Sequence, residues 1–402
     1  HIASGAGLRG GLRVVLCGQG RGEGGECDGY SHPPSGRRDP HPPKLTPPSA
    51  AARGQNYVSA GPPDGKMRGM PDDLPLETMV QAWIRQPESC SFDEILPQLH
   101  HFHHFHNAPY RAFCRSLGVG SLVARWRDIP CVPQSAFKHA DLRSFPATET
   151  VQTFRTSGTT GEGFGQHHFR TLEVYETAVR EGWRHAGLSS GPFLVIAPHP
   201  EEAPHSSLSH MLAMLAAKED FIAPRGELDL NRLRDLSGPV CLLGTALGFL
   251  HLAEALGSER IVLPAGSTAM ETGGYKGSGR VIARPQLYAM LGEKLGLAPA
   301  EMINEYGMTE LSSQFYARGP HGLHHGPPWA RAVVADPATL EEVAEGETGI
   351  LLIYDGANVG SVVGIRTQDL AVKHGSAFEL LGRDPSALPR GCSRAADEWL
   401  TS

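Results

Sequence analysis

The feature that most constrains the fold is an alternation of short apolar runs with amphipathic stretches in the middle of the chain. Three runs have the length and composition of buried strands, at residues 192–198, 240–243 and 260–263. Helical spacing of apolar residues predicts helices between and after them, at 207–218, 246–256 and 284–295. Strands that alternate with helices favour an α/β fold with a largely parallel sheet. Functional loops in such folds gather at the carboxyl ends of the strands.

Segments on both sides of this alternation extend the predicted fold. Helices are expected at 76–84 and 92–117, with the second one broken near Pro109. Strands at 349–354 and 364–372 predict a smaller β-rich part. The remaining pieces are a glycine- and proline-rich stretch, 1–69, expected to be disordered or non-native upstream sequence, and a short tail, 384–402. The core is therefore expected at 70–383.

A run of histidines and phenylalanines, His100 to His106, stands inside the second predicted helix. The i, i+3 spacing of Leu99, Phe102 and Phe105 predicts an apolar stripe that faces the core, with the histidines on solvated faces. A metal site is the alternative, but no carboxylate or cysteine joins the histidines at ligand spacing.

Composition excludes several classes of protein. A net charge of −7 and a pI near 6.3 argue against a nucleic-acid-binding protein. No apolar run is long and clean enough to span a bilayer, and no secretory signal is evident. The seven cysteines are odd in number and show no CxxC spacing, which is typical of a reducing, cytoplasmic location. Cys114, Cys131 and Cys241 lie in apolar patterns and are expected in the core.

A loop of small residues follows a predicted strand at 151–155 and precedes a predicted helix at 171–186. Its members are Thr156, Ser157, Gly158, Thr159, Thr160 and Gly161. Glycines and hydroxyl residues offer backbone and side-chain donors that can wrap an anion closely. The spacing is not that of a Walker loop. A plain flexible loop is the alternative.

Three later patches carry further polar chemistry. The patch NEYGMTE places Tyr306, Gly307, Thr309 and Glu310 within five positions. The patch RTQDL puts a single acid, Asp369, behind a strand. The third, GRD, contains Arg383 and is followed by RGCS, which contains Cys392.

Taken in order, TSGTTG, YGMTE, RTQDL and GRD resemble the motifs of the adenylate-forming superfamily of acyl-CoA synthetases and luciferase-like ligases. Three further features narrow the resemblance: Val132-Pro133 shortly before Phe137-Lys138, the run TGGYKG from Thr272, and the terminal RGCS. With these, residues 70–395 look like the acyl-protein synthetase (LuxE-like) family of bacterial fatty-acid reductases.

The resemblance implies an α/β adenylate-forming large domain, with mostly parallel sheets flanked by helices, that lacks the mobile C-terminal lid. It implies ATP-dependent activation of a long-chain fatty acid to acyl-AMP with Mg²⁺, followed by transfer to a protein cysteine. The expected acceptor partner is an acyl reductase.

The resemblance also assigns roles to residues. The loop 156–161 would hold the triphosphate by backbone and hydroxyl donors. In the NEYGMTE patch, Tyr306 would stack on adenine, Thr309 would bond the α-phosphate and Glu310 would bind Mg²⁺. Asp369 would accept the ribose hydroxyls, with Arg383 as a fixed positive charge nearby.

Two departures from the superfamily pattern bear on the mechanism. Gln368 stands where glycine is usual, a change expected to alter a turn without removing Asp369. The resemblance to the acyl-protein synthetases also leads us to expect no mobile lid and no lid lysine, so Lys276 is the candidate cation, with a plain surface lysine as the alternative. Cys392 lies between Arg390 and Arg394, which favour its thiolate, and is the candidate acyl acceptor, with an inert tail cysteine as the alternative.

Two other functions stay open from the sequence. One is a phenylacetate-type acyl-CoA ligase or adenylyltransferase, which would normally need the missing lid. The other is a degenerate, non-catalytic nucleotide- or acyl-binding module, which Gln368 and the absent lysine allow.

Overall fold

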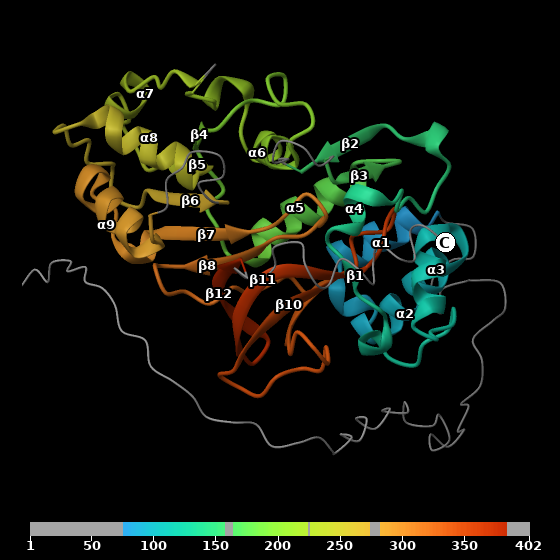
Figure 1. Cartoon of the computed structure of the whole chain (residues 1–402). Helices are drawn as coiled ribbons and strands as arrows, with labels where there is room; N and C mark the ends of the chain where they lie inside the picture. Colours follow the sequence, from blue (N-terminus) through green and yellow to red (C-terminus); the bar gives the residue numbers. More distant parts are fainter. Residues whose placement is uncertain (1–74, 157–163, 224–225, 274–281, 384–402) are drawn as a thin grey trace, which may run out of the picture. The chain divides into compact units, whose positions relative to one another are not determined.

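The fold is built around a five-stranded sheet with the order β4-β5-β6-β7-β8 (Figure 1). The computed structural model describes residues 75–156, 164–223, 226–273 and 282–383, all within the compact unit Ala60–Ser402. The first four strands are parallel, and the last is antiparallel to its neighbour. The strands are β4 (Phe193–Ile196), β5 (Cys241–Thr245), β6 (Thr268–Thr272), β7 (Met302–Tyr306) and β8 (Phe315–Arg318).

Helices cover both faces of this central sheet. The cluster on one face joins strand residues such as Leu243 and Ile303 to α5 (Glu173–His185) and α6 (Ser207–Leu215). The cluster on the other face joins the alternate residues of the strands, such as Leu242, to α8 (Ala246–Leu256) and α9 (Arg284–Leu295). Successive side chains of a strand point to opposite faces, so two apolar faces explain the continuous apolar runs. The predicted α/β class is confirmed.

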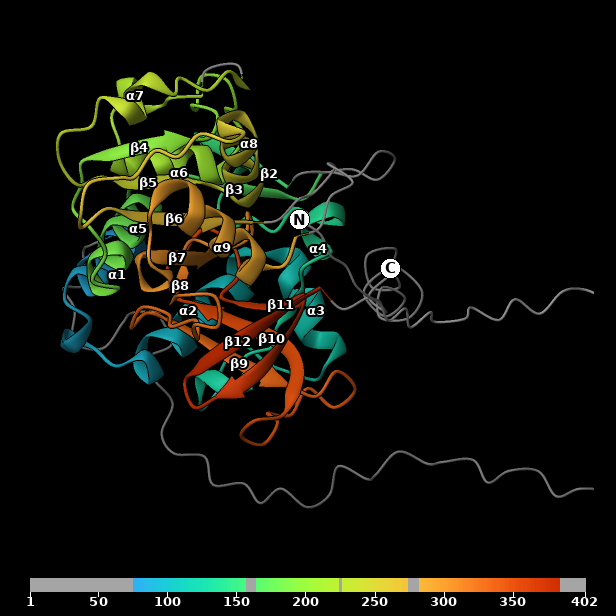
Figure 2. The same ribbon diagram turned by 90° about the vertical axis from the view of Figure 1, so that its left-hand side faces the viewer.

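A second, smaller sheet forms the β-rich part (Figure 2). Its strands are β1 (Val132–Pro133), β9 (Ala330–Ala335), β10 (Thr348–Asp355), β11 (Gly364–His374) and β12 (Ala377–Arg383). Strands β9 to β12 pair antiparallel, whereas β1 pairs parallel with β11, so that Val132 stands opposite Ile365. The Val-Pro and RTQDL patches of the sequence therefore lie side by side.

Three helices pack with this smaller sheet in one apolar cluster. These helices are α1 (Leu76–Arg85), α2 (Phe92–His106) and α3 (Ala108–Ser116). Two short helices, α4 (Ala136–His139) and α7 (Asn231–Arg234), come later in the chain. A capping box between Ser91 and Glu94 starts α2. The predicted break falls at Asn107, whose side chain accepts the Tyr110 N–H at 3.0 Å and caps α3.

The glycine-rich loop belongs to a β-hairpin that the sequence did not reveal. Strand β2 (Gln152–Arg155) pairs antiparallel with β3 (Gln166–Phe169), and these form a two-stranded sheet of their own. The loop thus joins two strands, and the helix α5 comes only after β3. The histidines of β3 gave it a polar appearance that concealed the strand.

The predicted strand at 260–263 is wrong. Instead, the Ile261 and Leu263 N–H groups donate to the carbonyls of Lys294 and Leu295, both at 2.9 Å, at the end of α9. The strand that fills the third place in the parallel sheet is β6, which contains the buried acid Glu271. A charge in a central strand hid β6, whereas an apolar segment that packs against a helix end looked like a strand.

The predicted orientation of the histidine run is also wrong. Phe105 is 56% exposed, whereas His100 and His103 are fully buried. His100 Nε2 is 2.9 Å from the Gly120 carbonyl, and His103 Nε2 is 2.8 Å from that of Val359. Burial lowers the pKa of His100 to about 4 and that of His103 to about 3, so both are neutral donors at physiological pH.

Two expectations from composition can be compared with the structure. Cys114 and Cys241 are buried as predicted, and Cys131 is half-buried beside the core cluster that contains α1 to α3. Among the described residues, no helix combines the length and apolar composition that crossing a membrane requires. The segment 1–69 and the tail 384–402 lie outside the described residues, so the predicted boundaries stay predictions.

Candidate active site

The carboxyl end of β7 and the middle of β11 meet at one hydrogen bond. Tyr306 is buried, and its hydroxyl donates to Asp369 Oδ2 at 2.9 Å. Rings of Phe315, His324 and Phe378 surround Tyr306, with centroids 5.6 to 6.3 Å away. Burial and the neighbouring Asp369 raise the pKa of Tyr306 well above its usual value, so the phenol is a constant donor. The structure thus brings the YGMTE and RTQDL patches together.

Asp369 is also placed opposite Arg383. The two residues are register partners on the antiparallel strands β11 and β12, next to a bulge at Leu370. The Asp369 N–H donates to Thr367 Oγ1 at 3.1 Å, which fixes the backbone locally. Gln368 lies inside the strand, not in a turn. A side chain is therefore tolerated at this position, and Asp369 keeps its place.

Glu310 is buried at the end of the YGMTE patch and is held from the smaller sheet. Its Oε1 accepts a hydrogen bond from Gln134 Nε2 at 3.0 Å, and its carbonyl accepts from Asn358 Nδ2 at 2.9 Å. The Gln134 N–H in turn donates to the Arg366 carbonyl at 2.9 Å. Sequence reasoning missed Gln134, although it directly follows the Val-Pro patch.

Thr309 is tied to the glycine-rich hairpin. Its carbonyl lies 2.9 Å from Nδ1 of His167, a residue of β3 that is 1% exposed. At the base of the loop, the Thr156 N–H donates to the Gly165 carbonyl, and the Gly165 N–H donates to Thr156 Oγ1, both at 2.9 Å. A Cβ on Gly165 would stand 3.0 Å from Thr156 Cγ2, so this closure favours glycine. The hairpin and the YGMTE patch are thus in direct contact.

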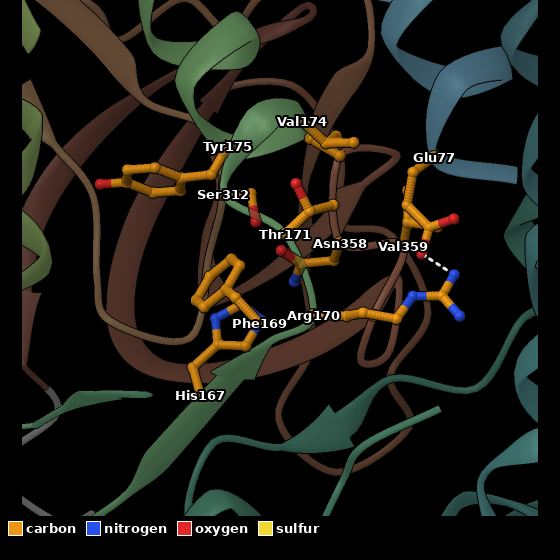
Figure 3. Close-up of a pocket in the computed structure, with 12 residues that line it drawn as sticks. Glu77, His167, Phe169, Arg170, Thr171, Val174, Tyr175, Ser312, Asn358 and Val359 are labelled. Carbon is orange, nitrogen blue, oxygen red and sulfur yellow. Dashed lines mark hydrogen bonds and ion pairs between the residues drawn. The ribbon is translucent and has the colours of Figure 1, made fainter. Parts of the chain in front are cut away.

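The segment after Glu310 is fixed from behind by a buried acid. Asp355 accepts the N–H groups of Ser312 and Ser313 at 2.8 Å each, and the Ser313 hydroxyl at 2.7 Å. Burial raises the pKa of Asp355, whereas these donors favour its charged form. A cavity of about 20 Å³, room for roughly one water molecule, separates this segment from His167 (Figure 3).

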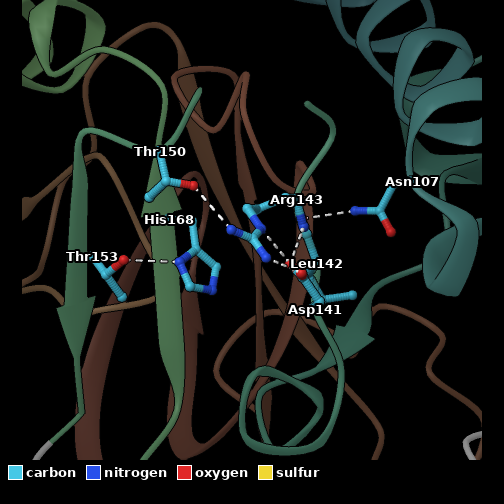
Figure 4. Close-up of polar contacts among 7 residues, drawn as sticks. All are labelled: Asn107, Asp141, Leu142, Arg143, Thr150, Thr153 and His168. Carbon is cyan, nitrogen blue, oxygen red and sulfur yellow. Dashed lines mark hydrogen bonds and ion pairs between the residues drawn. The ribbon is translucent and has the colours of Figure 1, made fainter. Parts of the chain in front are cut away.

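The approach to the hairpin is anchored by a polar cluster (Figure 4). Arg143 binds Asp141, with Nε 2.7 Å from Oδ1, and donates to Thr150 Oγ1 at 2.9 Å. Asn107 Nδ2, at the start of α3, donates to the Leu142 carbonyl at 2.7 Å. These contacts attach the chain that leads into β2 to the helical part. Within the hairpin, Thr153 and His168 bond across the strands at 2.9 Å.

Comparisons with known proteins found two curated relatives that share one name. The long-chain-fatty-acid–luciferin-component ligase of Vibrio harveyi is 24% identical over 356 residues, which are 82% of this chain and 94% of that protein. The Aliivibrio fischeri ligase of the same name is 22% identical over 350 residues, 80% and 92% of the two chains. No protein-family model matches the chain.

Solved structures of 2-hydroxyisobutyryl-CoA ligase show the same architecture. The open conformation with 2-HIB-AMP and CoA has a TM-score of 0.53 at 15% identity, over 82% of this chain and 80% of that one. The postadenylation state with R3-HIB-AMP has a TM-score of 0.54 at 16% identity, over 82% and 72%. The chain has the adenylate-forming ligase fold. It is a distant homologue of the two curated ligases.

Two buried carboxyl groups within this adenylate-forming fold were not foreseen. Glu271 ends near β6's carboxyl edge and accepts from Asn304 Nδ2 at 2.7 Å and from the Tyr288 hydroxyl at 3.2 Å. Glu305 accepts a hydrogen bond from Thr272 Oγ1. Burial raises the pKa of each carboxyl to about 7. Because neither β6 nor β7 was predicted as a strand, nothing in the sequence placed these two groups in the core.

Gly307 is explained by Glu305. A Cβ on Gly307 would stand 2.3 Å from Glu305 Oε1, so a larger residue would displace the carboxyl group or the loop. The glycine of the YGMTE patch therefore lets the chain turn closely past the end of β7.

Several predicted site residues cannot be placed. Ser157, Gly158, Thr159, Thr160 and Gly161 lie outside the described residues, as do Lys276 and Cys392. The described ranges contain no group of three or more His, Cys, Asp or Glu side chains arranged to hold a metal ion. The contacts given above bring six predicted site residues into two connected groups. One group contains Tyr306, Asp369 and Arg383, and the other contains Thr156, Thr309 and Glu310.

Proposed function

We propose that this chain is an ATP-dependent ligase that activates a long-chain fatty acid as acyl-AMP and transfers the acyl group to a protein cysteine. The observation that carries the proposal is the Tyr306–Asp369 hydrogen bond, which joins two separate sequence patches beside Arg383 and Glu310. The names of the two curated relatives support a long-chain fatty acid as the substrate.

The first half-reaction is the attack of a fatty-acid carboxylate oxygen on the α-phosphorus of ATP. The bond from the α-phosphorus to the bridging oxygen breaks, and pyrophosphate leaves. Thr156 and the residues 157–161 would hold the phosphates, and Thr309 would bond the α-phosphate. Asp369 would accept hydrogen bonds from the ribose hydroxyls, while Tyr306 and Gly307 would line the adenine site.

Glu310 suits a Mg²⁺ ion, which supplies charge neutralisation at the phosphates when bound. Mg²⁺ typically takes one or two protein carboxylates together with substrate phosphates and water. Glu310 is buried, and its Oε1 is already oriented by Gln134 at 3.0 Å. A single carboxylate of fixed direction therefore fits this ion. Lys276 is proposed as the cation that meets the carboxylate and α-phosphate.

The second half-reaction is the attack of the Cys392 thiolate on the acyl carbonyl carbon, which releases AMP and forms a thioester. Strand β12 ends at Arg383, opposite Asp369. Cys392 follows nine positions later, a length that spans up to about 30 Å when extended. The last described residue, Arg383, therefore lies beside the proposed nucleotide site, and nine extended residues would be long enough for Cys392 to reach it. Transfer onward to an acyl reductase would follow.

A cavity of about 740 Å³ is large enough to hold a long acyl chain. It runs along β8 from Gln314, which is close to Gly307, to Arg318. Leu188, Leu323 and Pro327 contribute apolar surface to its walls. Ligand cavities commonly measure 300–1,000 Å³, so the volume suits a long-chain substrate. We propose that the acyl chain lies here, with its carboxyl end toward Gly307.

The test measures each half-reaction with tetradecanoic acid. ATP–pyrophosphate exchange should depend on the acid and on Mg²⁺, and the labelled acid should then appear on the protein in a hydroxylamine-sensitive bond. Formation of acyl-CoA when CoA is supplied, without labelling of the protein, would point instead to an acyl-CoA ligase. Absence of exchange with every fatty acid tried would leave only a binding module.

A further inference from the structure

His167 connects two parts of the proposed site that come from distant segments. It lies on β3, in the hairpin that carries the glycine-rich loop, and contacts the Thr309 carbonyl at 2.9 Å through Nδ1. A carbonyl oxygen only accepts hydrogen bonds, so His167 is the donor and carries its proton on Nδ1. The ring is packed between Phe137 and Phe169, with centroids 5.8 and 4.3 Å away.

The environment keeps this donor constant. His167 is 1% exposed, and burial lowers its pKa to about 4. The ring is therefore neutral at physiological pH, and its orientation is held by two aromatic neighbours. A neutral ring with a fixed tautomer suits a residue that holds geometry, not one that exchanges protons.

The hairpin has no backbone ladder to the central sheet. Among the described strands, β2 and β3 pair only with each other. The position of the hairpin relative to the end of β7 therefore depends on side-chain packing, on the Arg155 N–H, which donates to the His205 carbonyl at 2.9 Å, and on contacts such as His167–Thr309. Asn358 and Gln134 also hold this patch, through Glu310.

His167 is also close to the loop along the chain. It follows Gly165, which closes the loop with Thr156, by two residues, or about 7 Å of extended strand. Strand β3 thus connects Gly165, at the base of the glycine-rich loop, to the contact between His167 and the carbonyl of Thr309, the residue that would bond the α-phosphate.

We propose that His167 is a positioning residue for acyl-adenylate formation, which sets the spacing between Thr309 and the pair Thr156–Gly165 at the base of the glycine-rich loop. This inference rests on the proposed function. A triphosphate that is held at both of these places requires the correct spacing between them. A misplacement of about 1 Å can cost on the order of 100-fold in rate. Acyl transfer to a cysteine needs no such spacing, because pyrophosphate has already left.

The experiment compares His167→Asn, His167→Gln and His167→Leu in ATP–pyrophosphate exchange. The Asn amide nitrogen stands near the place of Nδ1 and can still donate to Thr309, whereas the longer Gln side chain places its amide near Nε2. The expected kcat for exchange is within about 3-fold of wild type for Asn, and lower by about 10- to 100-fold for Gln and Leu. Transfer from supplied acyl-AMP should be unchanged in all three.

His168→Leu is the matched control. His168 is the next residue of β3, and its bond to Thr153 stays within the hairpin. Exchange in this variant should remain within about 3-fold of wild type. Melting temperatures identify any variant that fails to fold, and the polar Gln variant carries the test if Leu does not.

The outcomes separate the two proposals. Equal losses in the Asn and Gln variants, or parallel losses in exchange and in transfer, would overturn the role of His167 and leave the proposed function standing. Wild-type protein that exchanges pyrophosphate with no acid would overturn the proposed function, and the role of His167 with it.

Discussion

At the scale of single residues, the proposed site depends on polar groups that burial has changed. Tyr306 and His167 keep their protons in place at physiological pH, so each is a constant donor to a neighbouring oxygen. Glu310 is oriented by a neutral amide, that of Gln134. The carboxyl group of Glu305 behaves differently, because burial raises its pKa to about 7, where it titrates near neutral pH.

Replacing Glu310 by glutamine separates its charge from its packing. The amide oxygen in Glu310→Gln would still accept the Gln134 amide but could not bind Mg²⁺ as a carboxylate does. We expect exchange to fall by at least about 100-fold, with a melting temperature close to that of wild type. Glu310→Ala should also abolish exchange. Wild-type exchange rates in the Glu310→Gln variant would remove Glu310 from the metal site.

Glu305→Gln should change how stability depends on pH. The folded pKa of Glu305 is about 7, above the ordinary 4.5. Its contribution to the free energy of unfolding is therefore complete below pH 4.5 and is lost as the pH rises through about 7. A glutamine still accepts from Thr272 but does not ionise. The variant should gain stability relative to wild type between about pH 5.5 and 8, as measured by thermal unfolding.

The exposed Glu341 provides the control for this measurement. Glu341→Gln should leave the pH dependence of the melting temperature unchanged. A constant difference between Glu305→Gln and wild type across the pH range would contradict the raised pKa of Glu305.

At the scale of elements, the sequence predicted helices and strands that have a regular spacing of apolar residues. It missed features that depend on contacts with residues far along the chain. The helices α5, α8 and α9 and the strands β4 and β5 followed from spacing alone. The orientation of α2 did not, since its histidines are buried against carbonyls of Gly120 and Val359, which lie outside the helix. Strand β6 was missed for a similar reason, because Asn304 and Tyr288 accommodate its acid.

The candidate site divides in the same way. The order of the motifs predicted Tyr306 and Asp369, and the structure brings them together. Gln134, His167 and Asn358, which hold Thr309 and Glu310, carry no motif. Residues that orient other residues are recognisable only from contacts, since many residue types can donate one hydrogen bond to a carbonyl or carboxylate.

Helix α2 gives a prediction at this scale. The folded pKa of His103 is about 3, against an ordinary 6.5. Its contribution to stability is therefore complete above pH 6.5 and is lost as the pH falls, by roughly 2 kcal/mol at about pH 5. In His103→Gln the amide can still donate to Val359 but does not titrate. The variant should lose less stability than wild type between about pH 7 and 5 in denaturant unfolding.

His106, at the exposed end of α2, provides the matched control. His106→Gln should follow the wild-type pH dependence. If His103→Gln loses as much stability as wild type on acidification, His103 is not the group whose protonation opposes folding.

At the scale of the whole molecule, the proposed nucleotide site lies where the central sheet meets the smaller one. Tyr306 ends the central strand β7 and Glu310 follows it, whereas Asp369 lies on β11 and Gln134 directly follows β1. Strand β12 is the last described element and pairs with β11 at this same place. The chain therefore passes from the proposed adenylation site directly into the tail that carries Cys392.

Cys392→Ser should divide the reaction into its two halves. Acyl-AMP formation would use the glycine-rich loop, Glu310, Asp369 and a cation, and none of these is in the tail. Acyl transfer needs a nucleophile that ionises near neutral pH. A thiol between two arginines can do so, and a serine hydroxyl in the same place cannot. The variant should exchange pyrophosphate at the wild-type rate yet take up no labelled fatty acid in hydroxylamine-sensitive linkage.

Three cysteines in the described part of the chain make this test sharper. Cys114 and Cys241 are buried, and burial raises the pKa of each thiol to about 11, so neither is a ready nucleophile in the folded protein. Cys90 is half-buried and lies beside Glu94, and its pKa is raised by burial and by that carboxylate. Cys90→Ser is therefore the matched control and should label as wild type does. A thioester that persists in Cys392→Ser would assign the acyl group to another cysteine. Loss of labelling with intact exchange would instead assign the acyl group to the tail. Because β12 ends next to Asp369, the tail would then carry the acyl group away from the adenylation site.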